Sequence, residues 1–153
     1  MNVFISYSVK DLNLVQQIAF SIGPFATVYY WDQDKEPGKQ DWESIFRWID
    51  SSDLVLAIIT GNTAVRAMAV GNEIGHAKAK GKEIIPIVTP EVPQSELGVL
   101  EGIIYQRIDR THPQPALQIL SRIVQSRSEK LDKQRAIFIV GLLIGGLILL
   151  SRN

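Results

Sequence analysis

Cysteine is absent from the 153 residues of the chain, and histidine occurs only twice. Without cysteine the chain forms no disulfide, holds no metal through thiolates and has no thiol nucleophile. His76 and His112 are too few and too separated for a zinc site. Sixteen basic residues balance sixteen acidic ones, so no basic face favours nonspecific nucleic-acid binding. We therefore expect neither a metal centre nor a nucleic-acid partner.

The glycine-rich phosphate loops are also missing. Neither GxGxxG nor GxxxxGK[ST] follows an apolar strand-like run. A bacterial receiver domain, which is a doubly wound fold of this size, needs clustered acids after its first strand to hold Mg²⁺. The corresponding stretch here, SYSVKD, offers only Asp11. The receiver interpretation is therefore disfavoured, and any nucleotide would have to bind without these loops.

The composition is that of a globular protein, with 46% hydrophobic and 21% charged residues. The length suits one domain with a substantial core. The stretch from Met1 to Tyr7 has neither a basic start nor a cleavage site, so it is not a signal peptide.

Apolar runs alternate with segments of helical spacing along the first 127 residues. The runs predict strands, and the segments between them predict helices. A polar loop with Pro37 and Gly38 interrupts the pattern. Strand–helix alternation of this kind indicates a parallel sheet with helices on both faces and right-handed crossovers. The predicted strands are 2–7, 26–31, 53–60, 83–88 and 103–108; the predicted helices begin at 11, 42, 63 and 113, and the loop is 32–41.

In such sheets ligands bind beyond the carboxyl ends of the strands. The third predicted helix, 63–80, starts just after one of these ends and contains GNEIGHAKAKGK, in which Glu73 is the only acid. Glu73 is therefore a candidate site residue. The plain alternative is a solvated helix carboxylate paired with Lys78 or Lys80.

Four boxes occur in the order seen in Toll/interleukin-1 receptor (TIR) domains. FISYS (Phe4–Ser8) with Asp11 resembles the opening box of that family, and VYYWDQDKEPGKQDWESI (Val28–Ile45) resembles its second strand and the long loop after it. IDSSDLVLAIIT (Ile49–Thr60) and NEIGHAKAKGKEIIPI (Asn72–Ile87) resemble the central strand and the third helix with the fourth strand. The resemblance implies a flavodoxin-like, doubly wound, five-stranded parallel α/β fold.

Many bacterial TIR domains are similar to enzymes that cleave the nicotinamide–ribose bond of NAD+. The resemblance implies that Glu73 is the catalytic carboxylate, that NAD+ is a substrate and that no cofactor is needed. A carboxylate can stabilise the oxocarbenium character that develops on the ribose. The residues expected to line the NAD+ cleft are Tyr7, Ser8, Trp31, Asp32, Asp34 and Trp42.

One position departs from the family pattern. Active members usually carry tryptophan four residues before the glutamate, where this chain has Ala69. Three functions follow as hypotheses: an NAD+ nucleosidase in bacterial anti-phage defence, a non-enzymatic module that signals by TIR–TIR assembly, and an enzyme that makes a cyclic or conjugated ADP-ribose. The resemblance also implies that the domain self-associates.

Structural roles stay open for several of these residues. Ser8 can cap the following helix, and Asp32 and Asp34 can be solvated loop charges. His76 can be a helix-surface residue one turn from Glu73. Of Trp42 and Trp48, six residues apart, one is expected in the core.

AIFIVGLLIGGLILL (Ala136–Leu150) contains no polar side chain. As a helix it spans roughly 22 Å at 1.5 Å per residue, which is short for a hydrocarbon core of about 30 Å. Arg135 and Arg152 can snorkel to either surface. The sequence therefore predicts a TIR domain (1–127), a polar linker (128–135) and a single transmembrane helix (136–151). The basic residues before the helix predict a cytoplasmic domain, and a core helix is the alternative.

Overall fold

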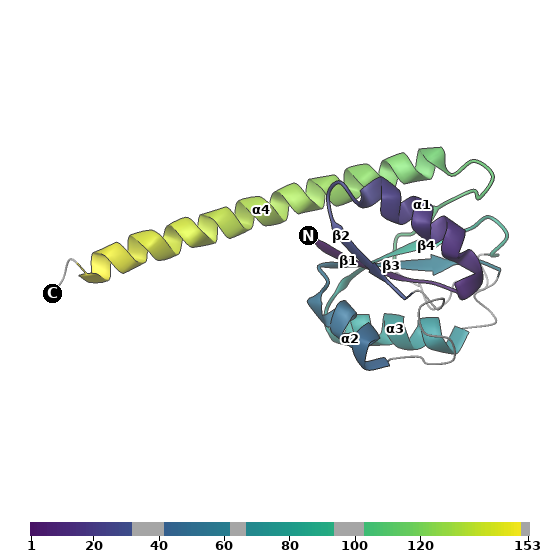
Figure 1. Ribbon diagram of the computed structural model, residues 1–153, viewed down its shortest axis with the longest axis horizontal. Coiled ribbons are helices and arrows are strands. Elements are labelled where there is room, and N and C mark those ends of the chain that lie inside the picture. The colour runs from purple at the N-terminus through teal and green to yellow at the C-terminus, as the bar shows by residue number, and fades with distance from the viewer. Residues whose placement is uncertain (32–41, 62–66, 94–102, 151–153) are drawn as a thin grey trace.

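A computed structural model describes the backbone of residues 1–31, 42–61, 67–93 and 103–150, and the side chains of these residues except 9, 67–69 and 140–150 (Figure 1). Five parallel strands form one sheet in the order β2-β1-β3-β4-β5. The strands are β1 (Asn2–Ser6), β2 (Thr27–Tyr30), β3 (Leu54–Ile59), β4 (Glu83–Val88) and β5 (Gln106–Arg107); the helices are η1 (Val9–Asp11), α1 (Leu12–Ile22), α2 (Trp42–Ser51), α3 (Ala67–Ala79) and α4 (Gln114–Leu150).

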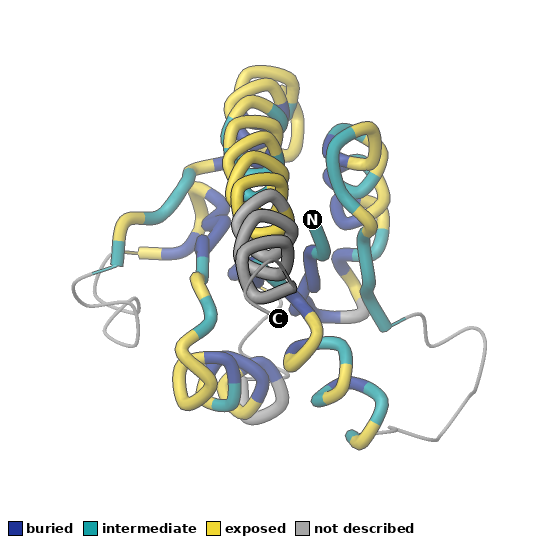
Figure 2. Tube along the Cα trace, turned by 90° about the vertical axis from the view of Figure 1, so that its left-hand side faces the viewer, coloured by how far each residue is buried: buried dark blue, intermediate teal, exposed yellow. Residues whose placement is uncertain are grey.

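Alternation along the strands divides the core between the two faces of the sheet. Val3 and Ile5 of β1 belong to a cluster that also contains buried residues of α1 and α4. Phe4, which lies between them, belongs to a second cluster with Ile45 and Ile49 of α2. α1 and α4 therefore cover one face, and α2 and α3 cover the other. The buried residues of the strands lie between these two layers (Figure 2).

The predicted parallel five-stranded α/β fold is confirmed. β4 has the predicted bounds, and β1 to β3 are each one or two residues shorter than predicted. β5 is much shorter, because Ile103 to Tyr105 precede the strand as irregular backbone and Ile104 is 91% exposed. The predicted 32–41 loop and the first residues of the third predicted helix, 62–66, lie outside the described residues.

The last helix is longer than the sequence predicted. We expected a helix over 113–127, a polar linker of helical character and a separate tail helix, but α4 runs as one helix without a break from Gln114 to Leu150 and includes the predicted linker, 128–135. Residues 116–140 contain neither glycine nor proline, so nothing in that stretch stops a helix. Arg135 of α4 lies 3.9 Å from Asp53, near the start of β3. Beyond this point α4 projects away from the sheet (Figure 1).

The transmembrane prediction for 136–151 is not supported by the structure. In the part of the chain that is described, no helix is long and apolar enough to cross a bilayer. Ile137, Phe138 and Ile139 are exposed. The side chains of 140–150, which make up most of the apolar run, lie outside the described residues.

Candidate functional site

Glu73 lies inside the domain and not on its surface. It is only 6% exposed, and its neighbours Val70 and Ile74 on α3 pack against Ala57 of β3. The alternative of a solvated surface carboxylate is therefore excluded. A carboxylate at this depth loses its hydration, and proteins tolerate that loss where the charge is compensated or used.

The outer side of α3 is bound to α2 through His76. The imidazole Nε2 lies 2.8 Å from Oδ1 of Asp50, and the ring stacks on Phe46 at 4.3 Å between centroids. The hydrogen bond from His76 is the main reason that the pKa of Asp50 is lowered. Lys80, one of the partners considered for Glu73, lies 3.7 Å from Asp50 instead. His76 and Lys80 therefore join two helices.

The structure does not bring the ring of Tyr7 together with Glu73. Tyr7 is buried in the cluster covered by α1 and α4, whereas Glu73 is on α3, at the opposite face. The Tyr7 hydroxyl donates a hydrogen bond to the carbonyl of Trp31, and its ring meets Tyr30 edge-on. Tyr7 thereby links the ends of β1 and β2.

Ser8 follows directly and is also buried. Its carbonyl oxygen accepts a 2.7 Å hydrogen bond from the backbone N–H of Asp11, which closes the turn of η1. Ser8 therefore helps to fix the backbone at the carboxyl end of β1. Asp32 and Asp34, the other polar residues expected in the cleft, lie outside the described residues.

Ser6 is a polar residue that sequence reasoning missed. It is 1% exposed, and its Oγ has no hydrogen-bond partner among the described residues. Alternation from Phe4 places it on the face covered by α2 and α3. It is in register with Ala57, against which α3 packs. A single polar residue ending the apolar run NVFI was the available signal.

The tryptophans gather around α2. The rings of Trp31 and Tyr29 lie 6.1 Å and 6.3 Å from that of Trp48, and Trp42 lies 5.6 Å from Phe46. Trp48 contacts the buried cluster on the face that α3 also covers. Trp31 and Trp42 are half-buried, and Trp31 packs against the same cluster as Trp48.

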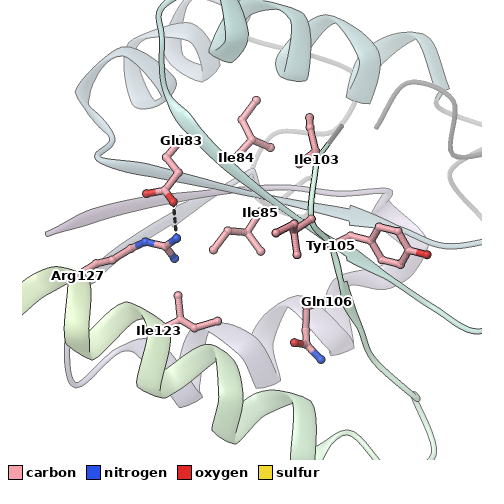
Figure 3. A pocket seen from close by; sticks show the side chains of 9 residues that line it. Glu83, Ile84, Ile85, Ile103, Tyr105, Gln106, Ile123 and Arg127 are labelled. Carbon is pink, nitrogen blue, oxygen red and sulfur yellow. Dashed lines mark hydrogen bonds and ion pairs between the residues drawn. The ribbon is translucent and has the colours of Figure 1, made fainter. Parts of the chain in front are cut away.

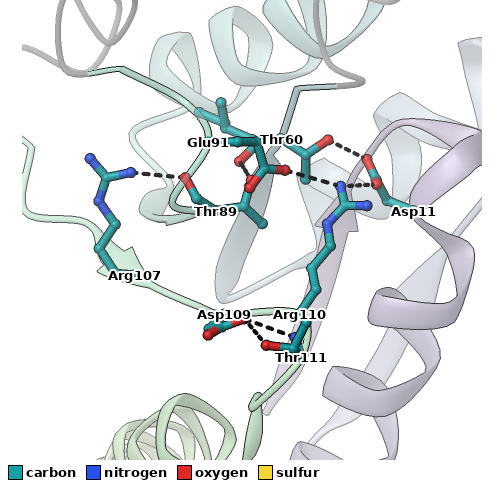
Figure 4. Close-up of polar contacts among 9 residues, drawn as sticks. Asp11, Thr60, Thr89, Glu91, Arg107, Asp109, Arg110 and Thr111 are labelled. Carbon is teal, nitrogen blue, oxygen red and sulfur yellow. Dashed lines mark hydrogen bonds and ion pairs between the residues drawn. The ribbon is translucent and has the colours of Figure 1, made fainter.

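A polar network ties together the carboxyl ends of the strands (Figure 4). The carboxylate of Asp11 accepts hydrogen bonds from the guanidinium of Arg110 at 2.6 Å and from the hydroxyl of Thr60 at 2.7 Å. The Asp11 side chain is 0% exposed. Arg110 also lies 3.7 Å from Glu91. Arg110 thus compensates a fully buried carboxylate and joins the loops after β1, β3, β4 and β5.

Glu91 completes this edge. Burial alone would raise the pKa of Glu91, but hydrogen bonds from its own backbone, Thr89 and the Gly61 backbone, together with the charge of Arg110, lower it overall. Arg107 donates to the carbonyl oxygens of Thr89 and Val92. Within the described residues no three histidine, aspartate or glutamate side chains are placed to hold a metal ion.

A sequence profile described as the TIR domain matches residues 3–121. The chain belongs to the TIR domain family. The buried Glu73 of α3 therefore sits within the matched part of the TIR domain. No curated protein matches the chain.

Two solved structures share the fold of this TIR domain. The CMP N-glycosidase BcmB of Clostridium botulinum is 19% identical, with a TM-score of 0.54 over 78% of this chain and 98% of that one. A 2-deoxyribosyltransferase of Bacillus psychrosaccharolyticus is 16% identical, with a TM-score of 0.52 over 69% of this chain and 85% of that one. At these identities the likeness concerns the fold.

Proposed function

We propose that this TIR domain is an NAD+ nucleosidase in which Glu73 carries the chemistry. The observation behind the proposal is the burial of Glu73 on α3, at the position where the family resemblance expects the carboxylate. A carboxylate screened from water interacts more strongly with a developing positive charge than a solvated one does.

In the proposed reaction the bond between the ribose C1′ and the nicotinamide nitrogen breaks, and its electron pair leaves with nicotinamide. Glu73 stabilises the oxocarbenium character that remains on the ribose. A water oxygen then bonds to C1′ and gives up a proton, which yields ADP-ribose. Nicotinamide leaves as a neutral molecule, so the reaction requires no strong acid at the leaving group.

The similar structures support the reaction class. One is named a CMP N-glycosidase and the other a 2-deoxyribosyltransferase, and both names describe chemistry on the sugar of a nucleoside or nucleotide. The choice of NAD+ rests on the TIR resemblance. CMP is therefore the comparison substrate, and release of cytosine instead of nicotinamide would move the proposal to another nucleotide.

The test is a chromatographic assay for nicotinamide and cytosine after incubation of the concentrated protein with NAD+ or CMP. We expect nicotinamide from NAD+, and loss of turnover by at least about 100-fold in Glu73→Gln, a near-isosteric change. Glu129→Gln, which alters an exposed glutamate of α4, is the matched control. Full turnover by a folded Glu73→Gln variant excludes this role for Glu73.

The second candidate function is assembly without catalysis, and Ala69 motivates it because active family members usually have tryptophan there. The side chain of Ala69 lies outside the described residues. This hypothesis predicts no loss of NAD+ even at high protein density, and self-association that changes at Pro37 or Gly38 abolish. Light scattering of the Pro37→Ala variant, beside the NAD+ assay, separates the two functions.

A third outcome is a cyclic or conjugated ADP-ribose product. The nucleophile is then a hydroxyl or a base nitrogen of a nucleotide in place of water. In mass spectrometry of the NAD+ products, a cyclic product is lighter than linear ADP-ribose by one water, and a conjugate is heavier by its acceptor less one water. Either product is consistent with the role proposed for Glu73.

The apolar run over 136–150 supports a membrane anchor with the TIR domain on the cytoplasmic side, as its flanking charges favour. Flotation with liposomes tests it: the full chain should float, and a chain ending at Gln134 should not.

The proposed biological role is anti-phage defence by NAD+ consumption. Cells that express the wild type should form fewer phage plaques than cells that express Glu73→Gln, and equal counts would contradict that role.

A further inference from the structure

A cavity lies at the edge of the sheet, between the first half of β4 and α4 (Figure 3). β5 pairs only with Ile87 and Val88 of β4. The segment before β5 passes the first half of β4 as irregular backbone, and the space between this segment and α4 is incompletely filled. The resulting cavity measures about 450 Å³, within the range of small-molecule sites.

The walls of the cavity are mainly aliphatic. Ile84 and Ile85 of β4, Ile103 of the preceding segment and Ile123 of α4 line it. Such walls favour an apolar body, because each buried CH₂ group contributes about 0.8 kcal/mol in transfer from water. The cavity is thus a largely apolar site formed by β4, the segment before β5, and α4.

One nitrogen atom of the Arg127 guanidinium at this cavity has no hydrogen-bond partner among the described residues. Arg127 of α4 uses Nη2 to donate to the Glu83 carboxylate, while its Nη1 is buried and makes no hydrogen bond to any described residue. A buried N–H of a guanidinium favours an oxygen acceptor. The Glu83 carboxylate already balances the positive charge of Arg127. A neutral ligand that accepts this hydrogen bond keeps that balance, whereas a charged ligand would disturb it.

We infer that this cavity binds a small neutral amphiphile with an aliphatic body and one carbonyl oxygen. The aliphatic part lies among the isoleucines, and the carbonyl oxygen accepts from Nη1 of Arg127. The cavity lining contains no residue of α3. Ile85 and Ile123 face the α1–α4 side of the sheet, whereas Ile84 packs on the other side, against the cluster that contains Ile74. Binding here requires no NAD+ chemistry, so the inference stands or fails independently of the proposed function.

Three eight-carbon probes test it on the full chain by calorimetry. Octanamide offers a neutral acceptor, octanoate a charged acceptor, and octylammonium no acceptor. We expect saturable binding of octanamide, weaker binding of octanoate because its charge lies beside Glu83, and no binding of octylammonium. In Glu83→Gln the competing carboxylate is gone, so octanoate should then bind more tightly than octanamide.

Two pairs of variants locate the site. Ile123→Phe fills the cavity and should abolish octanamide binding, whereas Ile119→Phe, one turn away on exposed α4 surface, should not. Arg127→Met keeps an apolar stem and removes the donor, so affinity should fall about tenfold, while the same change at exposed Arg122 should have no effect. Glu83 is about half exposed and stays solvated when Arg127 is changed, so the fold should persist.

Several results would overturn the inference. One is equal binding of all three probes, which indicates nonspecific apolar adsorption. Another is octanamide binding that neither Ile123→Phe nor Arg127→Met weakens. A third is absence of saturable binding up to the solubility of the probe. Self-association of the protein that Ile123→Phe disrupts would make the cavity an interface between copies, and would equally contradict it.

Discussion

Two buried serines of this domain differ in whether their hydroxyl groups are bonded. Ser52 is 2% exposed, and its Oγ donates to the carbonyl of Trp48 at 2.6 Å. Ser6 is equally buried, but its Oγ has no partner in the described chain. A buried hydroxyl without a partner costs about 1–3 kcal/mol. The unbonded hydroxyl of Ser6 therefore lowers the stability of the folded domain. Ser6 lies on the same face of the sheet as Glu73.

Replacement of each serine by alanine should have opposite consequences. Ser6→Ala should leave the free energy of unfolding unchanged or raise it, because it removes an unbonded polar group. Ser52→Ala should lower it by about 1 kcal/mol, because the Trp48 carbonyl loses its 2.6 Å hydrogen bond and keeps the longer, 3.1 Å bond from the Ser51 hydroxyl. Urea denaturation measures both. A loss of stability in Ser6→Ala as large as that in Ser52→Ala would show that Ser6 is bonded in solution.

Arg110 and Asp11 should respond unequally to truncation. Arg110→Ala leaves a carboxylate with 0% exposure without its cation and should destabilise the domain by about 3–5 kcal/mol. Asp11→Ala should cost less, because the Arg110 side chain is 38% exposed and can return to water. Thermal or urea unfolding measures which variant loses more stability. Equal losses in Arg110→Ala and Asp11→Ala would contradict this prediction. Arg122→Ala on exposed α4 is the neutral control.

Acid should weaken the network through Glu91. The pKa of Glu91 is lowered in the folded protein, so its contribution is complete at neutral pH and is lost as the pH falls through that lowered pKa. Glu91→Gln should therefore be less stable than wild type at pH 7, with a difference that shrinks toward about pH 3. Urea titrations across this pH range measure the difference in the free energy of unfolding. A difference that grows on acidification would contradict the predicted pH dependence.

Single-sequence reasoning located Glu73 but not its environment. The order of boxes placed the glutamate on the third helix, yet the segment GNEIGHAKAKGK is so poor in large apolar residues that it does not reveal which face is buried. Tyr7 was expected in the cleft because it lies at the carboxyl end of the first predicted strand. Strand alternation turns its ring into the α1–α4 core instead. Ser6 was missed because a hydroxyl without a partner is visible only after folding.

At the scale of elements, the buried strands were the most predictable parts. β3 and β4 are continuous apolar runs because helices cover both of their faces. β5 carries only two paired residues at the edge of the sheet, so its pattern was weak and its predicted length too great. α4 was predicted as a domain helix, a polar linker and a tail helix, because the composition changes along it from amphipathic to polar to apolar. Its polar residues continue the helix beyond the domain.

α4 should consist of a part that stabilises the domain and a part that does not. Ser21 and Ser121 donate hydrogen bonds across the α1–α4 contact at 3.2 Å, and buried side chains of α4 extend to Val124. Gln125→Pro should lower the free energy of unfolding by about 3 kcal/mol. Gln134→Pro, also at an exposed glutamine, should reduce helical circular dichroism without that loss. Equal destabilisation by the two prolines would contradict the division.

For the whole molecule, the direction of α4 relates the tail to the proposed site. The strands point away from the projecting end of α4, so their carboxyl ends lie on the side of the domain remote from the tail (Figure 1). If the tail inserts in a bilayer as proposed, the carboxyl edge faces away from the membrane. NAD+ then reaches the site without hindrance from lipid.

Attachment to a surface should raise turnover per molecule, because anchoring concentrates domains that are proposed to work as assemblies. The full chain on liposomes should release nicotinamide faster than the same amount of a chain ending at Gln134 in solution. The two should become similar when the shorter chain is concentrated. A rate independent of both density and liposomes would contradict a role for assembly in catalysis.

We propose above that the buried carboxylate of Glu73 makes this TIR domain an enzyme that cleaves NAD+. The most direct measurement compares nicotinamide release from NAD+ by the wild type, Glu73→Gln and Glu129→Gln on liposomes, with folding checked by circular dichroism. We expect release by the wild type and by Glu129→Gln and almost none by Glu73→Gln. No release by the folded wild type, or equal release by all three proteins, would contradict it.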